Sequence, residues 1–187
     1  KIRFEGDGYS PEWESEAKKR KLSNNRTTPE ALDIQLSKIT TSLFEEMEVM
    51  NAVELKARHE IELEEYVKRV QIESRVLGDM ARNHIIPTAI RYQNLLIENV
   101  KGLKEIFEAD YKIIAKEQIK IIEQISTYIK QINEGITAMI EIRKKANQLG
   151  MKERASMYKD SVIPFFKEIR YASDKLELLV EDKLWPL

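Results

Sequence analysis

Apolar residues recur at steps of three and four through most of the chain, which predicts amphipathic helices rather than strands. Three long patterns cover about residues 52–107, 111–149 and 152–180, and two shorter ones, at about 11–21 and 28–47, precede them. Long helices joined by short turns pack antiparallel. We therefore expect an all-α fold, an elongated antiparallel helical bundle of three long helices plus two shorter N-terminal helices.

Each pattern has one apolar face that we expect to be buried, because an amphipathic helix turns such a face to the core. Around residues 80–89 the polar positions thin out, so burial on several sides is expected there. In chain order the predicted buried positions are Leu32, Leu36, Ile39, Leu43 and Met47 or Phe44; Leu63, Val67, Val70, Leu77, Ala81 and His84; Ile90, Leu95, Leu96, Val100, Leu103 and Phe107; Ile114, Gln118, Ile121, Ile125, Tyr128, Ile132, Ile136, Met139, Arg143 and Ala146; and Met157 or Tyr158, Val162, Phe165, Ile169, Ala172, Leu176 and Leu179.

Local signals mark where helices begin. Ser10-Pro11 and Thr28-Pro29 each place a hydroxyl residue, which can accept from free amides, before a proline that suits the first helical position. Asn51-Ala52-Val53-Glu54 has the form of a capping box with Asn in place of Ser or Thr. We expect the chain to break near residues 49–51 and a new helix to follow.

Other residues predict ends and interruptions of helices. Gly150 is placed as a C-terminal cap of the helix before it, and Asp110 is a candidate cap after the turn at residues 108–111. Pro87 and Pro164 lie inside helical patterns, where proline costs about 3 kcal/mol because it lacks an N–H and crowds the preceding turn. Each proline should kink its helix, divide it, or be tolerated through packing.

The polar stretch Ser23–Thr28 suggests a division into a short N-terminal segment, 1–27, and a helical bundle domain, 28–187. The chain begins with Lys rather than Met, and no signal peptide opens it, so the simplest interpretation is a segment of a longer protein. The apolar end Leu184-Trp185-Pro186-Leu187 should dock on this domain or on further chain.

Composition excludes several function classes. Lys and Arg number 31 against 32 Asp and Glu, a net charge of −1, which gives no electrostatic case for nucleic acid or for an anionic membrane. The absence of cysteine excludes disulfides, thiolate metal sites and cysteine nucleophiles, and fits a reducing compartment such as the cytoplasm. No apolar run approaches the roughly 18 residues that a membrane span requires.

Two histidines bear on metal chemistry. His59 lies among charged residues and is predicted on a solvated face, whereas His84 lies on the apolar stripe, where a histidine is more often a hydrogen-bonded core residue than a ligand. The Glu-x-x-His pairs of di-metal helical bundles and the His-Glu-x-x-His motif are absent. The acidic run Glu60–Glu65 is interpreted as a charged helix face rather than a metal cluster.

Basic residues offer two further candidates. Arg91 and Arg170 each precede a tyrosine in an apolar segment and could reach a phosphate or carboxylate, although pairing with an acidic residue at an interface is the favoured interpretation. The run Lys18–Lys21 is interpreted as cations that complement the C-terminus of a short helix. From the residues alone, the chain is a helical packing or assembly domain without a self-contained active site.

Several stretches, in order along most of the chain, have amino-acid sequences similar to those of one known family. They are Ile2-Arg3-Phe4-Glu5-Gly6-Asp7-Gly8-Tyr9-Ser10-Pro11-Glu12-Trp13, Thr27-Thr28-Pro29-Glu30-Ala31-Leu32, Asn83-His84-Ile85-Ile86-Pro87-Thr88-Ala89-Ile90-Arg91-Tyr92-Gln93-Asn94, Glu168-Ile169-Arg170-Tyr171, Lys175-Leu176-Glu177-Leu178-Leu179-Val180-Glu181-Asp182 and Leu184-Trp185-Pro186-Leu187. Together they resemble the C-terminal region of type III glutamine synthetases, the long-chain bacterial form.

The resemblance implies a parent enzyme that condenses glutamate and ammonia with ATP and a divalent metal, Mg, as a ring-shaped homo-oligomer. The family's catalytic barrel lies upstream, and none of its motifs matches a position here, so no catalytic, cofactor-binding or metal residue is carried over. The segment alone is not expected to be an enzyme. Its implied role is to buttress the catalytic region and to contribute contacts between sister subunits, through the apolar tail and one exposed helix face.

Two alternatives stay open. The long regular pattern over residues 111–149 also fits a free-standing coiled-coil-like scaffold or interaction protein, which predicts a native product of this size. A domain that binds a regulator or a small effector is the third hypothesis, and it would be tested by ligand-induced thermal shifts.

Overall fold

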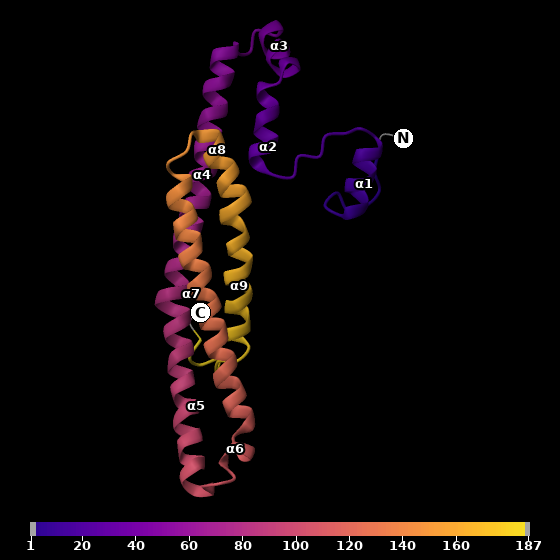
Figure 1. Ribbon diagram of the computed structural model, residues 1–187. Coiled ribbons are helices and arrows are strands. Elements are labelled where there is room, and N and C mark those ends of the chain that lie inside the picture. The colour runs from indigo at the N-terminus through magenta and orange to yellow at the C-terminus, as the bar shows by residue number, and fades with distance from the viewer. Residues whose placement is uncertain (1–2, 186–187) are drawn as a thin grey trace. The chain divides into compact units, whose positions relative to one another are not determined.

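The computed structural model describes residues 3–185, shown in Figure 1. Within that range the chain forms helices and no strands, which confirms the all-α prediction. The helices fall into two compact units, Lys1–Tyr66 and Val67–Leu187, and the long helix α4 (Ala52–Met80) contributes to both. The division at residue 28 suggested by the sequence stays a prediction.

The first unit carries short helices, and one predicted helix proves to be three. The pattern over residues 28–47 is divided because Ser37 adopts an extended backbone (φ −66°, ψ 150°) and its hydroxyl accepts from the Thr40 amide, which begins a new helix. The elements before α4 are α1 (Pro11–Lys19), α2 (Thr28–Asp33), the 3₁₀ turn η1 (Ile34–Leu36) and α3 (Lys38–Glu46).

The start signals before α1 and α4 are confirmed, whereas the cap expected of Thr28 is wrong, because Thr28 is the first residue of α2 and the N-cap residue Thr27 makes no side-chain hydrogen bond to the helix. The Ser10 hydroxyl accepts from the Trp13 amide at 3.3 Å, and Pro11 takes the first helical position of α1. Asn51 Oδ1 accepts from the Glu54 amide at 3.0 Å, while Glu54 Oε2 accepts from the Asn51 amide at 2.9 Å. This reciprocal pair is a capping box, and it satisfies two amides at the start of α4 that have no helical partner.

Residues with positive φ follow three helices in the described part of the chain, none of them is glycine, and two of the three, Lys21 and Glu48, adopt a left-handed cap. After α3, Glu48 has φ 54° and the Val49 amide donates to the Phe44 carbonyl at 2.9 Å, the pattern of a Schellman motif. The same geometry follows α1 at Lys21, with φ 57°. The prediction that Gly150 caps a helix C-terminus is wrong, because Gly150 has φ −59° and ψ 163° and instead precedes the first residue of α8.

The second unit contains the longer helices. The predicted helix over residues 111–149 is interrupted at Ala115, whose backbone (φ −88°, ψ 11°) closes a turn before α7. Asp110 makes no side-chain cap to α6. After α4 the elements are the π-helix η2 (Ala81–Ile85), α5 (Ile86–Phe107), α6 (Tyr111–Ile114), α7 (Lys116–Ala146), α8 (Met151–Met157), the π-helix η3 (Tyr158–Val162) and α9 (Ile163–Glu177).

Helices α5 and α7 run antiparallel, as contacts along their length show. Near the C-terminal half of α7, Arg82 Nη2 in η2 donates to Thr137 Oγ1 at 3.3 Å. Further along α5, Gln93 Nε2 donates to Ser126 Oγ at 2.7 Å. Residue numbers therefore rise along α5 while those of its contacts fall along α7. This is the antiparallel arrangement expected of long helices joined by a short turn.

Helices α7 and α9 also lie side by side, and Figure 1 shows α5, α7 and α9 together. The Tyr158 hydroxyl donates to Asn147 Oδ1 at 3.0 Å, while a Cβ added at Gly135 would lie 3.2 Å from Ile169 Cγ1. These helices bury the predicted stripes from residue 125 onward, and the fully buried large side chains among them are Ile125, Ile132, Ile136, Met139, Tyr158, Val162, Ile169 and Leu176.

Both prolines in helical patterns follow a π turn. Pro87 and Pro164 are each the second residue of an α-helix, and a five-residue π-helix stands directly before that helix. A proline removes an amide donor and crowds the carbonyl four residues back. The wider π turn offers a different pairing, because the amides of Ile86 and Ile163 bond to carbonyls five residues back. The helical path thus continues through each proline.

Burial around residues 80–96 differs from the prediction. Ala81, Ile86 and Ala89 are buried, but Ile90 and Leu95 on the predicted stripe are exposed. The expected burial of residues 80–89 on several sides is wrong, since residues 80 and 82–84 are exposed. The predicted face was extrapolated at α-helical spacing, and the π turn adds one residue to the repeat.

Candidate functional site

His59 lies in the interior of the first unit, so its prediction on a solvated face is wrong. Its side chain is 4% exposed, and His59 Nε2 lies 3.1 Å from Asp33 Oδ1. His59 is four residues after Leu55 and four before Leu63, both of which are buried. That spacing places it on the apolar stripe of α4, a signal that its charged neighbours obscured.

The acidic run that begins at residue 60 joins α4 to its neighbours by polar contacts. Gln35 Nε2 donates to Glu62 Oε2 at 2.7 Å, and Arg58 Nε donates to Glu62 Oε1 at 3.3 Å. Within residues 3–185 no group of three or more His, Asp or Glu side chains could hold a metal ion. Glu62 thus joins α4 to the turn η1 through Gln35, and it pairs with Arg58 one turn away within α4.

His84 is exposed, so its prediction as a core residue is wrong. It lines a hollow of about 390 Å³ in the second unit, together with Asp174 and Glu177 of α9 and Trp185. Trp185 belongs to the apolar end of the chain, which was expected to dock on this domain or elsewhere. Its partly buried ring beside α9 supports docking here, while the last two residues of that stretch, 186 and 187, lie outside the described range.

The two arginine candidates are exposed and bonded within their own helices. Arg91 Nη2 donates to Thr88 Oγ1 at 2.7 Å, and Thr88 is buried. Arg170 Nε lies 3.8 Å from Asp174 Oδ2, an exposed pair one helical turn apart. Pairs of this kind contribute little to stability, about 0.3–0.5 kcal/mol. The structure brings neither arginine to a common site with the histidines.

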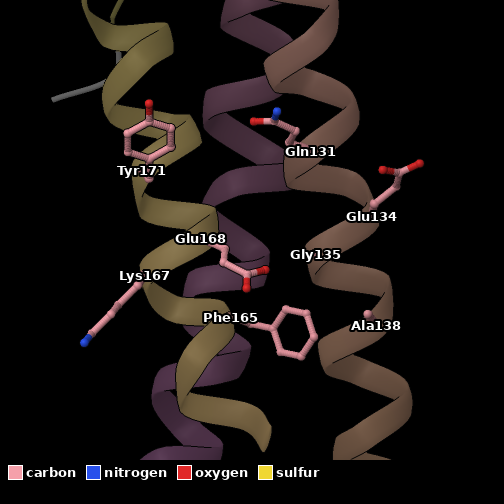
Figure 2. Close-up of a pocket in the computed structure, with 8 residues that line it drawn as sticks. All are labelled: Gln131, Glu134, Gly135, Ala138, Phe165, Lys167, Glu168 and Tyr171. Carbon is pink, nitrogen blue, oxygen red and sulfur yellow. The ribbon is translucent and has the colours of Figure 1, made fainter.

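A groove of about 760 Å³ runs between α7 and α9 (Figure 2). Phe165 and Glu168 of α9 point toward it, and Tyr171 stands at one end, while Lys167 points away from α7. The small residue Gly135 lets α9 approach α7 closely. This groove could not be predicted from the sequence, because it depends on how two helices pack against each other.

The chemistry of this groove is that of a binding surface. Its polar groups are two carboxylates, one amide, an exposed ammonium and a phenol, and its aromatic residues Phe165 and Tyr171 both belong to α9, so it can hold an apolar or cationic group. The prediction that the segment contains no catalytic, cofactor-binding or metal residue stays a prediction. Among residues 3–185, no helix combines the length and apolarity needed to cross a membrane.

The fold and these grooves define an all-α domain of packed antiparallel helices. A family model described as "Glutamine synthetase C-terminal domain" matches residues 1–104. Glutamine synthetase of Bacteroides fragilis (strain YCH46) is 44% identical over 188 residues, covering 100% of this chain and 26% of that protein. The chain belongs to the glutamine synthetase C-terminal domain family.

Two further relatives match over the same share of their length. The type-3 glutamine synthetase of Dictyostelium discoideum is 32% identical over 192 residues, covering 100% of this chain and 26% of the relative. Glutamine synthetase of Butyrivibrio fibrisolvens is 28% identical over 186 residues, covering 98% of this chain and 26% of the relative. The chain thus spans about a quarter of the length of the curated relatives it matches.

Proposed function

We propose that this chain is the helical C-terminal domain of a type III glutamine synthetase and that it acts in structural support and oligomer assembly. The type III assignment is supported by the relative named type-3, which matches along the whole chain. The parent would condense glutamate and ammonia with ATP and Mg in the cytoplasm. This domain, on our proposal, supplies no catalytic residue of its own.

The observation that carries the assembly role is an apolar stripe on α3. Ile39 is 84% exposed, and Leu43 and Met47 follow at steps of four on the same helix face and are also exposed. Val49 and Val53 continue the exposed apolar surface toward α4. A cluster of large exposed apolar side chains marks an interaction site, because leaving it in water costs about 25 cal/mol per Å².

The partners that we propose for this stripe are the upstream catalytic region and sister subunits of the homo-oligomer. About three quarters of each matched relative lies outside the aligned segment, so a large covalently attached partner is at hand. A tethered region meets the stripe at a high effective concentration, so even a modest contact is populated. Glu45 and Glu48 beside the stripe favour a partner surface that carries basic residues.

The test introduces a charge into the stripe of the full-length protein. Ile39→Asp should shift the assembly to smaller species and lower ATP-dependent glutamine formation, because a carboxylate cannot be buried without a partner. Light scattering after gel filtration gives the mass. The matched control is Ile113→Asp, which charges an equally large side chain, 77% exposed, outside the stripe. An intact assembly with full activity in the Ile39 variant would refute the role.

The scaffold alternative rests on the 31-residue helix α7 and differs in the size of the native product. An antibody against this segment should detect a polypeptide several times larger than 21.9 kDa if the ligase proposal holds. A native product near that mass would favour the free-standing scaffold instead.

A further inference from the structure

Another hollow of the second unit is lined by three arginines. It encloses about 320 Å³ between α7 and the segment formed by the end of α4 and η2. Arg75 and Arg82 lie seven residues apart on one side, and Arg143 of α7 faces them from the other. One carboxylate, Asp79, lines the same hollow. Three guanidinium groups against one carboxylate leave an excess of positive charge around a small volume.

The bonding of these side chains leaves donors unused. Arg143 Nε is buried and has no hydrogen-bond partner. Arg75 makes no hydrogen bond or ion pair in the part of the chain that the structure describes, and Arg82 donates only to Thr137 Oγ1 at 3.3 Å. Asp79 accepts from Asn83 Nδ2 rather than from an arginine. In the described part of the chain, this carboxylate therefore forms no ion pair with the arginines that line the hollow.

A buried guanidinium donor without a partner is costly, because its charged N–H group has lost its hydrogen bond to water and gained none in return. An oxyanion in the hollow would remove that cost and offset the repulsion among like charges. Guanidinium groups hold phosphate through paired, planar N–H donors, and the Asn83 amide at the rim can add another. The volume is at the lower end of the range for small-ligand sites, which suits a phosphate group rather than a large molecule.

Part of the lining of the hollow is apolar. Ile136, Met139 and Ile140 of α7 line it, and a Cβ added at Gly78 would meet Ile136 Cγ2 at 3.5 Å. Apolar packing beneath charged groups lowers the local dielectric, which strengthens their attraction for an anion. We propose that this hollow is a binding site for a phosphate group, either as the free ion or as part of a small metabolite.

The test follows the Arg143 Nε–H resonance of the ¹⁵N-labelled 187-residue chain during titration with inorganic phosphate. Chloride at equal ionic strength provides the reference, because salt alone screens charges. Phosphate should shift this resonance saturably, and Arg143→Gln should weaken phosphate binding at least tenfold by calorimetry. The matched control Arg91→Gln, which removes an exposed arginine outside the hollow, should leave binding unchanged.

Each other outcome is decisive. An unchanged Arg143 resonance, or equal weakening by both variants, would overturn the proposal in favour of general charge screening. If Arg143→Gln fails to fold, Arg82→Gln serves in its place, since the Arg82 side chain is exposed and contacts only a surface hydroxyl. Repeating the titration with glucose 6-phosphate distinguishes the sources: tighter binding than the free ion indicates a metabolite, and weaker binding indicates inorganic phosphate. Neither result depends on the assembly role.

Discussion

In the first unit, single side chains stabilise the packing of α4 against the segment before it. The His59 imidazole is buried against Asp33, and Ala in its place would remove the hydrogen bond between the two side chains and open a cavity. We expect His59→Ala to lower the free energy of unfolding by about 1–3 kcal/mol, the cost of a lost hydrogen bond and of lost packing. Urea denaturation followed by circular dichroism measures the change.

The control is the other histidine. His84 is exposed, so His84→Ala should alter the free energy of unfolding by no more than about 0.5 kcal/mol. Equal effects of the two substitutions would contradict the buried position of His59.

At the left-handed residues that end two helices, a substitution is expected to stabilise the protein rather than destabilise it. Glu48 has φ 54°, a conformation that costs an L residue with a Cβ about 1 kcal/mol relative to glycine. We expect Glu48→Gly to raise the free energy of unfolding by about 0.5–1 kcal/mol in urea denaturation. Glu48→Ala removes the same charge but keeps the Cβ, so it should give no such gain, and an equal gain would assign the effect to charge.

At the scale of elements, three helical glycines differ in their surroundings. A Cβ added at Gly102 meets nothing within 4 Å, at Gly78 it makes an ordinary contact of 3.5 Å, and at Gly135 it lies 3.2 Å from Ile169 Cγ1. Replacing an interior helical glycine with alanine gains about 0.8–1.0 kcal/mol from propensity alone. We expect thermal melts to rank the alanine variants, from most to least stable, Gly102, Gly78 and Gly135, because crowding of α9 offsets the gain at Gly135.

A larger side chain sharpens the comparison. Gly135→Leu should destabilise the second unit, since α9 would have to move away from α7, whereas Gly102→Leu has open space. If both leucine variants were equally stable, the close approach of α7 and α9 would be in doubt.

Helix starts could be predicted from the sequence because the signals that make them are local. Ser10 and Asn51 sit within three residues of the amides that they cap. The break at Ser37 carried the same kind of signal, but the apolar stripe through it is continuous and obscured it. Hydrophobic periodicity indicates which face of a helix is buried, whereas a capping residue indicates where a helix begins, so a prediction needs both signals.

The buried face around Pro87 could not be predicted, because the π turn before this proline changes the helical repeat, whereas the predicted positions Ile169 and Leu176 beyond Pro164 are buried. Ala81 and Ile86 are both buried, five residues apart, and the Ile86 amide bonds the Ala81 carbonyl. Extrapolation at a spacing of three and four placed His84 inside, whereas the wider turn leaves it exposed. A proline in a helical pattern is therefore a point where the predicted buried face should be restarted rather than extended.

At the scale of the whole molecule, the sequence could not indicate which side chains meet across helices. Arg75 and Arg143 are far apart in the chain, and only the antiparallel pairing of their helices places both in one hollow. The stripe on α3 shows the converse, since its spacing is that of a buried face and the described chain leaves it exposed. A face that the domain itself does not cover is what a segment of a larger protein would present.

The division into two units makes a prediction about cooperativity. Ile132 is fully buried in the second unit, and Ile132→Ala should destabilise that unit by about 2–5 kcal/mol, through lost burial and the cavity left behind. Because α5 and α9 both pack against α7, which carries Ile132, hydrogen exchange measured by mass spectrometry should show faster exchange in all three helices. The amides of α1 and α2, which belong to the first unit, should keep their exchange rates. The control variant Ile113→Ala, at an exposed position, should leave exchange unchanged in every helix. Faster exchange in α1 and α2 as well, in the Ile132 variant, would mean that the continuous helix α4 couples the two units into one cooperative structure.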